Sequence, residues 1–355
     1  MPTCIARKAT TATPTIGTGV RNGPLPAERS RKNGKASRWR CSASINRSLK
    51  RPQAQKPATL ADSVSDTITL ADGRRLGWAE FGDPQGLPLF YFHGFPASRL
   101  EGKLIEGAAL RNGIRVIASD RPGYGISDFQ PGRRLLDWPC DVKALADRLS
   151  IDRFMVLGVS GGGPYALACA HAMAPRLRAV GVVCGLGPVF EPWARSSLPW
   201  PARLGFGLAR RSKRLLQFVY GGATAWVIKH RPEALRRLLT SSAPEADSSV
   251  LRQPEINQIL FDSARESLRQ GPEGALWDFI AYAHPWGFRP QDIRPRVQLW
   301  HGEADALVPP AHGRYFATAL PNAAAKFLPG EGHFSLPVKH MDMILRALAS
   351  DRAES

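Results

Sequence analysis

Short apolar segments alternate with helical stretches through the middle of this 355-residue chain. The segments LPLFYFHG, IRVIASD, RFMVLGV and LRAVGVVCG, all between residues 87 and 185, are almost wholly apolar, as strands are when helices cover both faces of a sheet. Before them, two alternating runs between residues 66 and 82 meet at Asp72-Gly73, a strong hairpin signal. The pattern predicts an α/β fold with a mostly parallel, twisted sheet and helices on both faces.

The alternation stops after Gly187 and resumes with the strand-like segments RVQLWHG (296–302) and AAKFLPGEG (324–332). The intervening residues are helical in pattern and rich in Trp, Pro and Arg. We therefore expect a core made of residues 61–187 and 291–355, with a helical cap of residues 188–290 inserted after the sixth strand.

Residues 1–60 hold much of the positive charge of the chain. The formal net charge is +18, from 48 Lys and Arg against 30 Asp and Glu, and 13 of the basic residues lie in this segment with a single acid, Glu28. The remainder has 35 basic and 29 acidic residues, so its charge does not predict nucleic-acid binding by the folded part. We expect residues 1–60 to form a disordered tail. Its composition suits an organelle transit peptide, an arm that binds anionic surfaces, or upstream sequence without a role.

Neither a membrane span nor a secretory signal is expected. The chain is 43% hydrophobic but contains no run of about 18 to 20 apolar residues, and its N-terminus lacks the apolar run of a signal peptide. The five cysteines show no C-x-x-C spacing, which favours scattered reduced thiols over disulfides or a zinc site. We expect a cytoplasmic protein, or one of an organelle stroma or matrix if the tail is a transit peptide.

The segment GVSGG (158–162) ends one predicted strand and begins an Ala-rich helix. It satisfies G-x-S-x-G in the strand–turn–helix setting where that motif exposes a serine nucleophile. Small neighbours allow a sharp turn that holds Ser160 in strained backbone geometry, and the helix N-terminus presents N–H groups beside it. Glycine-rich turns also bind phosphates, but this one lacks both the G-x-G-x-x-G order and a Walker Gly-Lys-Ser/Thr.

Five motifs, in order, resemble those of the α/β-hydrolase superfamily: FHGFP (92–96), DRPGYGISD (120–128), GVSGGG (158–163), WHGEADALVP (300–309) and GEGHFS (330–335). The resemblance implies a catalytic triad of Ser160, Asp305 and His333, in the chain order that this fold uses. It also implies an oxyanion hole formed by the backbone N–H groups of Phe95 and Gly161. These residue types suit acyl transfer, because a serine hydroxyl is a weak nucleophile until an imidazole takes its proton and a carboxylate orients that imidazole.

Other acidic residues compete with Asp305 for the role of the triad acid. Glu303 shares its loop, and Glu191 follows the sixth predicted strand. The family pattern and the shorter side chain favour Asp305. Asp120 and Asp128 are interpreted as structural residues of their turn. No His/Asp/Glu cluster is evident at ligand spacing, so we expect neither a metal site nor a cofactor.

Aromatic residues of the predicted cap give the one hint about the substrate. Trp193, Trp226 and Trp277 are predicted to line an apolar pocket over Ser160, although such residues also form the core of small helical caps. The sequence thus predicts a serine hydrolase that cleaves a carboxylic ester or related acyl bond of a small, apolar molecule through an acyl-enzyme. Hydrolysis of a carbon–carbon bond next to a ketone, cofactor-free perhydrolysis, and a non-catalytic small-molecule receptor of the same fold are the alternatives.

Overall fold

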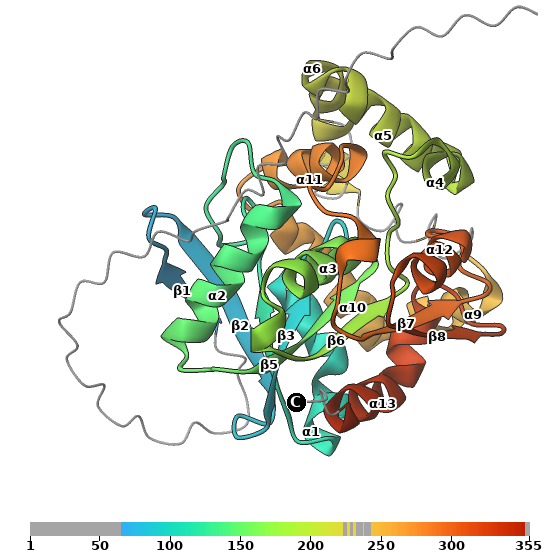
Figure 1. Cartoon of the computed structure of the whole chain (residues 1–355). Coiled ribbons are helices and arrows are strands. Elements are labelled where there is room, and N and C mark those ends of the chain that lie inside the picture. Colours follow the sequence, from blue (N-terminus) through green and yellow to red (C-terminus); the bar gives the residue numbers. More distant parts are fainter. Residues whose placement is uncertain (1–64, 223–225, 228–229, 232–236, 238–242, 352–355) are drawn as a thin grey trace, which may run out of the picture. The chain divides into compact units, whose positions relative to one another are not determined.

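The computed structural model describes residues 65–222, 226–227, 230–231, 237 and 243–351, so the predicted tail lies outside the described residues. Within them, an eight-stranded sheet has the strand order β1-β2-β4-β3-β5-β6-β7-β8 (Figure 1). The strands are β1 (Ser65–Thr69), β2 (Arg75–Gly82), β3 (Leu87–Phe92), β4 (Ile114–Ser119), β5 (Phe154–Val159), β6 (Leu177–Val183), β7 (Val297–Gly302) and β8 (Ala323–Leu328).

The directions of the strands follow the sequence pattern. β1 and β2 form the predicted hairpin, and Gly73 in its turn has a φ of 86°, a conformation that glycine adopts readily. β2 also pairs antiparallel with β4, whereas every pairing from β3 to β8 is parallel. The predicted mostly parallel sheet is therefore confirmed.

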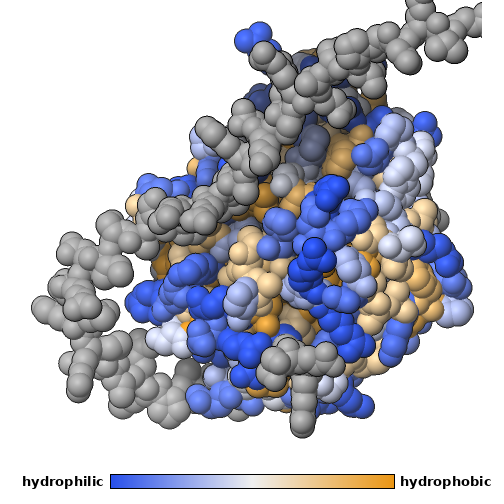
Figure 2. Space-filling view, in the orientation of Figure 1, coloured by the Kyte–Doolittle hydropathy of each residue, from blue (hydrophilic) through white to orange (hydrophobic). Residues whose placement is uncertain are grey.

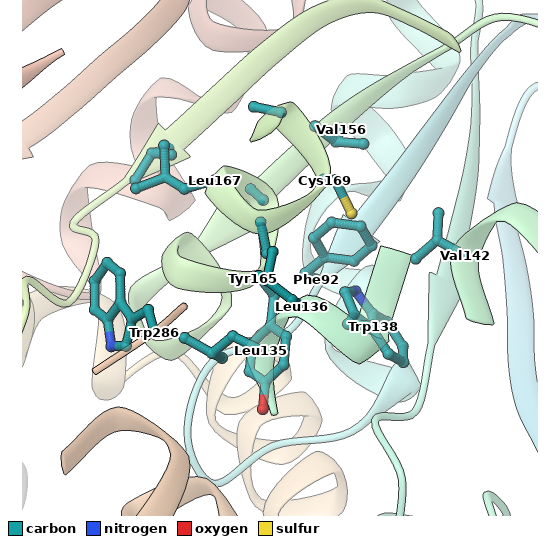
Figure 3. Packing of buried hydrophobic residues seen from close by; sticks show 14 of the residues in the cluster. Phe92, Leu135, Leu136, Trp138, Val142, Val156, Tyr165, Leu167, Cys169 and Trp286 are labelled. Carbon is teal, nitrogen blue, oxygen red and sulfur yellow. The ribbon is translucent and has the colours of Figure 1, made fainter. Parts of the chain in front are cut away.

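Helices of the core cover both faces of the sheet. Phe90 and Phe92 of β3 belong to the buried cluster formed with α2 and α3, whereas Leu89 and Tyr91 belong to the cluster formed with α1 and α13. Figure 3 shows the first cluster, in which side chains of β3 and β5 pack with those of α2 and α3. The core helices are η1 (Arg99–Ile105), α1 (Glu106–Arg111), η2 (Leu135–Asp137), α2 (Trp138–Arg148), η3 (Ser160–Gly162), α3 (Gly163–Ala172), η4 (Ala174–Arg176), η6 (Pro290–Asp292), α12 (Ala311–Ala319) and α13 (Ser335–Ser350).

The insertion between β6 and β7 consists of helices in two groups. In one group, α5, α6 and η5 pack with α11; in the other, α10 packs against η1 and α9 packs against α13. Figure 1 shows α5, α6 and α11 together at the top of the view. The helices are α4 (Pro192–Ser197), α5 (Trp200–Arg211), α6 (Lys213–Leu216), the π-helix η5 (Gln217–Gly222), α9 (Glu245–Leu251), α10 (Pro254–Ser267) and α11 (Glu273–Ala283).

The surface of the described part mixes residue types. On the face seen in Figure 2, hydrophilic side chains are interspersed with hydrophobic ones. None of the helices in the described ranges is both long and apolar enough to cross a membrane.

Candidate active site

Ser160 lies at the sharp turn between β5 and α3. Its φ is 54°, in the left-handed region that residues other than glycine rarely adopt. The glycines on either side permit the turn: a side chain on Gly158 would clash with the carbonyl group of Gly162, and one on Gly162 would clash with the carbonyl group of Phe92. The chain therefore turns tightly enough to hold the hydroxyl of Ser160 at the carboxyl end of the parallel strands.

The structure brings the three predicted triad residues together. Asp305 follows β7 and His333 follows β8, so both reach the same end of the sheet as Ser160. His333 Nε2 lies 3.0 Å from Ser160 Oγ, and His333 Nδ1 lies 2.7 Å from Asp305 Oδ2. These distances allow a proton to pass from the hydroxyl to an imidazole held by a carboxylate.

Burial and pairing act on the pKa values of Asp305 and His333 in opposite directions. Burial raises the pKa of the Asp305 carboxyl, but His333, together with His301 and the Val308 N–H, brings this pKa below its ordinary 3.8. For His333, burial lowers the pKa, but Asp305, with smaller contributions from Asp247 and Glu101, raises it above the ordinary 6.5. The pairing thus keeps Asp305 ionised and makes His333 a stronger proton acceptor.

The two alternative acids lie elsewhere. The side chain of Glu303 is 41% exposed and pairs with Arg314 at 3.2 Å, and Glu191 is exposed ahead of α4. Asp305, in contrast, is buried, and its Oδ1 accepts the N–H groups of Leu307 and Val308 at 2.9 and 2.8 Å. These two hydrogen bonds fix the carboxylate with its other oxygen toward His333.

The two predicted oxyanion donors are neighbours across the turn. A Cβ built on Gly161 would lie 2.7 Å from the Cβ of Phe95. Arg121 holds the Phe95 loop, because its guanidinium donates to the carbonyl oxygens of His93 and Gly94 at 2.6 and 2.8 Å. The two predicted donors therefore lie close together at the turn that carries Ser160.

A buried network of charged side chains supports the loop of Phe95 through Arg121. The carboxylate of Asp278, on α11, accepts hydrogen bonds from Arg121 Nε at 2.9 Å and from Arg133 Nη2 at 2.5 Å. All three side chains are at most 2% exposed. The hydroxyl of Tyr282, one turn later on α11, lies 2.7 Å from the carbonyl oxygen of Gly161 and 3.2 Å from Asp278 Oδ2. Although burial raises the pKa of Asp278, the two arginines lower it well below its ordinary value. The insertion thus contacts both sides of the candidate oxyanion hole.

A second carboxylate of the insertion holds the loop of His333. Asp247 of α9 is 1% exposed and accepts the backbone N–H groups of His333, Phe334 and Ser335 at 2.9, 2.9 and 2.8 Å. Ser335 begins α13, so the carboxylate also satisfies N–H groups at the start of a helix.

A cavity of about 380 Å³ opens at Ser160 and His333. Its walls are largely apolar, and the insertion contributes side chains of α9 and α10 that include Leu251, Leu260 and Phe261. The volume is at the small end of the range of ligand pockets, which is about 300 to 1,000 Å³. The site therefore suits a small molecule with an apolar part.

The three tryptophans predicted for this pocket do not line the cavity. The Trp193 ring packs against Tyr315 of α12, with ring centroids 5.0 Å apart. The Trp277 Nε1 donates to the carbonyl oxygen of Arg133 at 2.8 Å, and Trp226 is 51% exposed. The prediction fails because the part of the insertion that lines the cavity consists mainly of aliphatic and Phe side chains of α9 and α10. The three indoles lie outside the cavity lining.

Residues 88–339 match the family model described as the alpha/beta hydrolase fold. The chain belongs to the α/β-hydrolase family. It is 35% identical over 126 residues to a non-heme chloroperoxidase of Streptomyces lividans, a match that covers 35% of this chain and only 45% of that relative. It is 31% identical over 224 residues to a pimeloyl-[acyl-carrier protein] methyl ester esterase of Aromatoleum aromaticum, covering 62% and 81% of the two chains.

A solved bromoperoxidase of Bacillus anthracis superposes with a TM-score of 0.60 at 20% identity, covering 81% of this chain and 98% of that one. This likeness shows the fold. Together with membership of the α/β-hydrolase family, the relative named as an esterase supports a hydrolase.

The structure also places three potential metal ligands near one another, which the sequence spacing did not indicate. Donor atoms of Cys184, His301 and Asp305 all lie within 4.8 Å of one another. They come from the ends of β6 and β7, which are far apart in the sequence but adjacent in the sheet. His301 Nε2 donates to Val308 O at 2.8 Å, and burial raises the pKa of the Cys184 thiol well above its ordinary value. We therefore interpret these groups as surroundings of Asp305 within the α/β-hydrolase site.

Sequence patterns did not reveal four supporting residues, Arg121, Asp247, Asp278 and Tyr282. A partial signal exists for two of them, because Asp278 is the one acid within the otherwise apolar segment ALWDFIAYA (275–283) and Tyr282 follows it by four residues, on the same helix face. Asp247 lies in the polar segment EADSS (245–249) and has no comparable signal.

Proposed function

We propose that this α/β-hydrolase cleaves a carboxylic ester, or a related acyl bond, of a small molecule with an apolar part, through an acyl-enzyme on Ser160. The observation that carries the proposal is the continuous hydrogen-bonded path from Ser160 Oγ through His333 to Asp305, which opens on the apolar cavity. The pimeloyl ester esterase among the relatives is consistent with this substrate class.

The proposed reaction begins when Ser160 Oγ attacks the carbonyl carbon and its proton passes to His333 Nε2. The amides of Phe95 and Gly161 stabilise the negative oxygen of the tetrahedral intermediate. The carbon–oxygen bond to the leaving alcohol then breaks, and the alcohol takes the proton from His333. A water molecule, deprotonated by His333, attacks the acyl-enzyme and releases the carboxylic acid and free Ser160.

The test combines active-site labelling with an ester series. We expect a fluorophosphonate probe to label Ser160, and p-nitrophenyl esters of increasing acyl length to be hydrolysed until the chain exceeds the cavity. Failure of both measurements on folded protein would contradict a serine hydrolase. Tight binding of an ester without turnover would favour a receptor instead.

Perhydrolysis is a second candidate, which the chloroperoxidase and bromoperoxidase among the similar proteins favour. In this reaction hydrogen peroxide replaces water at the acyl-enzyme, so that the product is a peracid and no electron leaves the protein. Peracid formation from acetate and hydrogen peroxide, measured by bromide-dependent halogenation of monochlorodimedone, distinguishes it from hydrolysis alone.

A further inference from the structure

One carboxyl group lines the otherwise largely apolar wall of the cavity at Ser160. It belongs to Glu101 of η1, a residue that is only 7% exposed. No Lys or Arg lines the cavity, and Glu101 makes no ion pair with any residue that the structure describes. A carboxylate is expensive to bury without partners, so its presence in this wall needs an explanation.

The two oxygens of Glu101 have different surroundings. Oε1 accepts hydrogen bonds from the Tyr91 hydroxyl at 2.7 Å and from the Gly94 N–H at 2.9 Å. Oε2 accepts none from the described residues. A methyl group placed on the Gly94 Cα would lie 3.3 Å from Oε2 and 3.7 Å from the Cβ of Ser160. The unused oxygen therefore borders the same small space as the side chain of Ser160.

A purely structural role for Glu101, in which it holds the loop of Gly94, does not explain why Glu101 has a second carboxylate oxygen at the cavity. That role uses Oε1 alone, and an amide oxygen would serve equally well there. Burial raises the pKa of Glu101 above its ordinary 4.5, although Tyr91, Gly94 and Arg121 oppose this rise. Donors on Oε1 and the nearby positive charge favour the carboxylate form, which can only accept hydrogen bonds.

We propose that Glu101 Oε2 accepts a hydrogen bond from a hydroxyl or ammonium group of the substrate, close to the carbonyl carbon that Ser160 attacks. The proposal rests on the hydrolase function above and narrows its substrate class to acyl compounds that carry such a donor. The aliphatic walls hold the remaining apolar part, and the donor at Glu101 sets which acyl groups are preferred. A hydrogen bond to a charged, buried acceptor discriminates strongly, because a substrate without the donor leaves the acceptor unpaired.

Glu101→Gln tests the proposal, because it keeps an amide oxygen for Tyr91 and Gly94 but places a donor where Oε2 was. The measured quantity is kcat/KM for p-nitrophenyl 3-hydroxybutyrate and 3-aminobutyrate, each divided by the value for p-nitrophenyl butyrate. We expect at least one ratio of about ten or more in the native protein, and a fall of that ratio by about tenfold or more in Glu101→Gln. The larger of the two ratios tells whether a hydroxyl or an ammonium group is preferred.

Glu106→Gln is the matched control, because Glu106 follows η1 and pairs with Lys103 rather than lining the cavity. It should leave both ratios unchanged. A 3-methoxybutyrate ester, which can accept but not donate, should show no preference over butyrate. Preference for the methoxy ester, or equal ratios in native protein and Glu101→Gln, would overturn the proposal.

Binding separates this proposal from the hydrolase function. Ser160→Ala protein should bind methyl 3-hydroxybutyrate or methyl 3-aminobutyrate more tightly than methyl butyrate in calorimetry, and the added substitution Glu101→Gln should abolish the difference. If the protein hydrolyses esters but prefers no substrate with a hydrogen-bond donor, in kinetics or in binding, only the proposed role of Glu101 is refuted. Donor preference in binding without hydrolysis or probe labelling supports Glu101 and refutes the hydrolase.

Discussion

The carboxylate of Asp247 accepts the backbone N–H of His333 at 2.9 Å, although 86 residues separate the two in the chain. Asp247 belongs to the insertion and His333 to a loop of the core. The insertion therefore takes part in fixing the imidazole that faces Ser160, in addition to forming one wall of the cavity.

Removing this carboxylate should impair the reaction through the position of His333. We expect Asp247→Ala to lower kcat by about tenfold to a hundredfold, since a misplacement of about 1 Å at a reacting group costs about that much. Asp247→Asn retains one oxygen acceptor and should recover part of the loss. The exposed neighbour Glu245 provides the control, because Glu245→Gln should leave kcat unchanged. Native kcat in folded Asp247→Ala would show that the His333 loop is held by other contacts.

Substitution of Ser160 tests the nucleophile directly. Ser160→Ala should abolish ester hydrolysis and fluorophosphonate labelling, because no hydroxyl remains for the probe or the substrate to modify. Its far-ultraviolet circular dichroism should match that of the native protein. Retention of most of the ester turnover would contradict an acyl-enzyme at this residue.

The triad acid is tested by a pair of substitutions in one loop. Asp305→Asn should lower kcat by about a thousandfold or more, because an amide neither enforces the required tautomer of His333 nor stabilises its positive charge. Glu303→Gln should cost less than about tenfold, since Glu303 pairs with Arg314 at the surface. The two barriers should thus differ by at least about 2.7 kcal/mol. The reverse order would transfer the role to Glu303.

The pH dependence of the reaction follows from His333. Only the neutral imidazole can accept the proton of Ser160, so kcat/KM should fall as the pH drops through the pKa of His333 in the free enzyme. Because Asp305 raises that pKa, the midpoint of the acid limb should lie above 6.5. In Asp305→Asn the midpoint of probe labelling should move to lower pH. A native midpoint at or below 6.5 would contradict this coupling.

Asp278 is the single carboxylate between two buried arginines, so its loss should destabilise the fold. We expect Asp278→Asn to lower the free energy of unfolding by about 3 to 5 kcal/mol, because it leaves Arg121 and Arg133 without their negative partner. The midpoint of urea unfolding measures the change. Asp262→Asn is the control, since its pair with Arg265 is exposed and should contribute about 1 kcal/mol or less. Equal midpoints for both variants would show that the buried charges are compensated otherwise.

The sequence predicted the parts of the fold that depend on local pattern. Almost continuous apolar runs identified the buried parallel strands, and Asp72-Gly73 identified the hairpin, because both depend on a few adjacent residues. The proximity of Ser160, Asp305 and His333 followed from a resemblance of ordered motifs rather than from any local rule.

Contacts between the insertion and the core could not be predicted from local sequence pattern. Asp247 approaches His333 because α9 packs on α13, and a pairing between helices so far apart in the chain has no local signature. Nothing in the sequence distinguishes Glu101 from the other charged residues near it, because its burial follows only from the packing of η1 against α10. The tryptophan prediction failed for the same reason, since composition does not tell which helix of an insertion faces the cavity.

The contacts of Asp278 with Arg121 limit how this protein can diverge. A chimaera that received the insertion of a relative lacking this carboxylate would keep two buried guanidinium groups with no counter-ion, and a loss of Asp247 would free the loop of His333. Exchange of the whole insertion would therefore remove both the counter-ion of the buried arginines and the contact that holds the loop of His333. Single substitutions at wall positions such as Leu260 and Phe261 would change the shape of the cavity and leave the contacts of Asp278 and Asp247 in place.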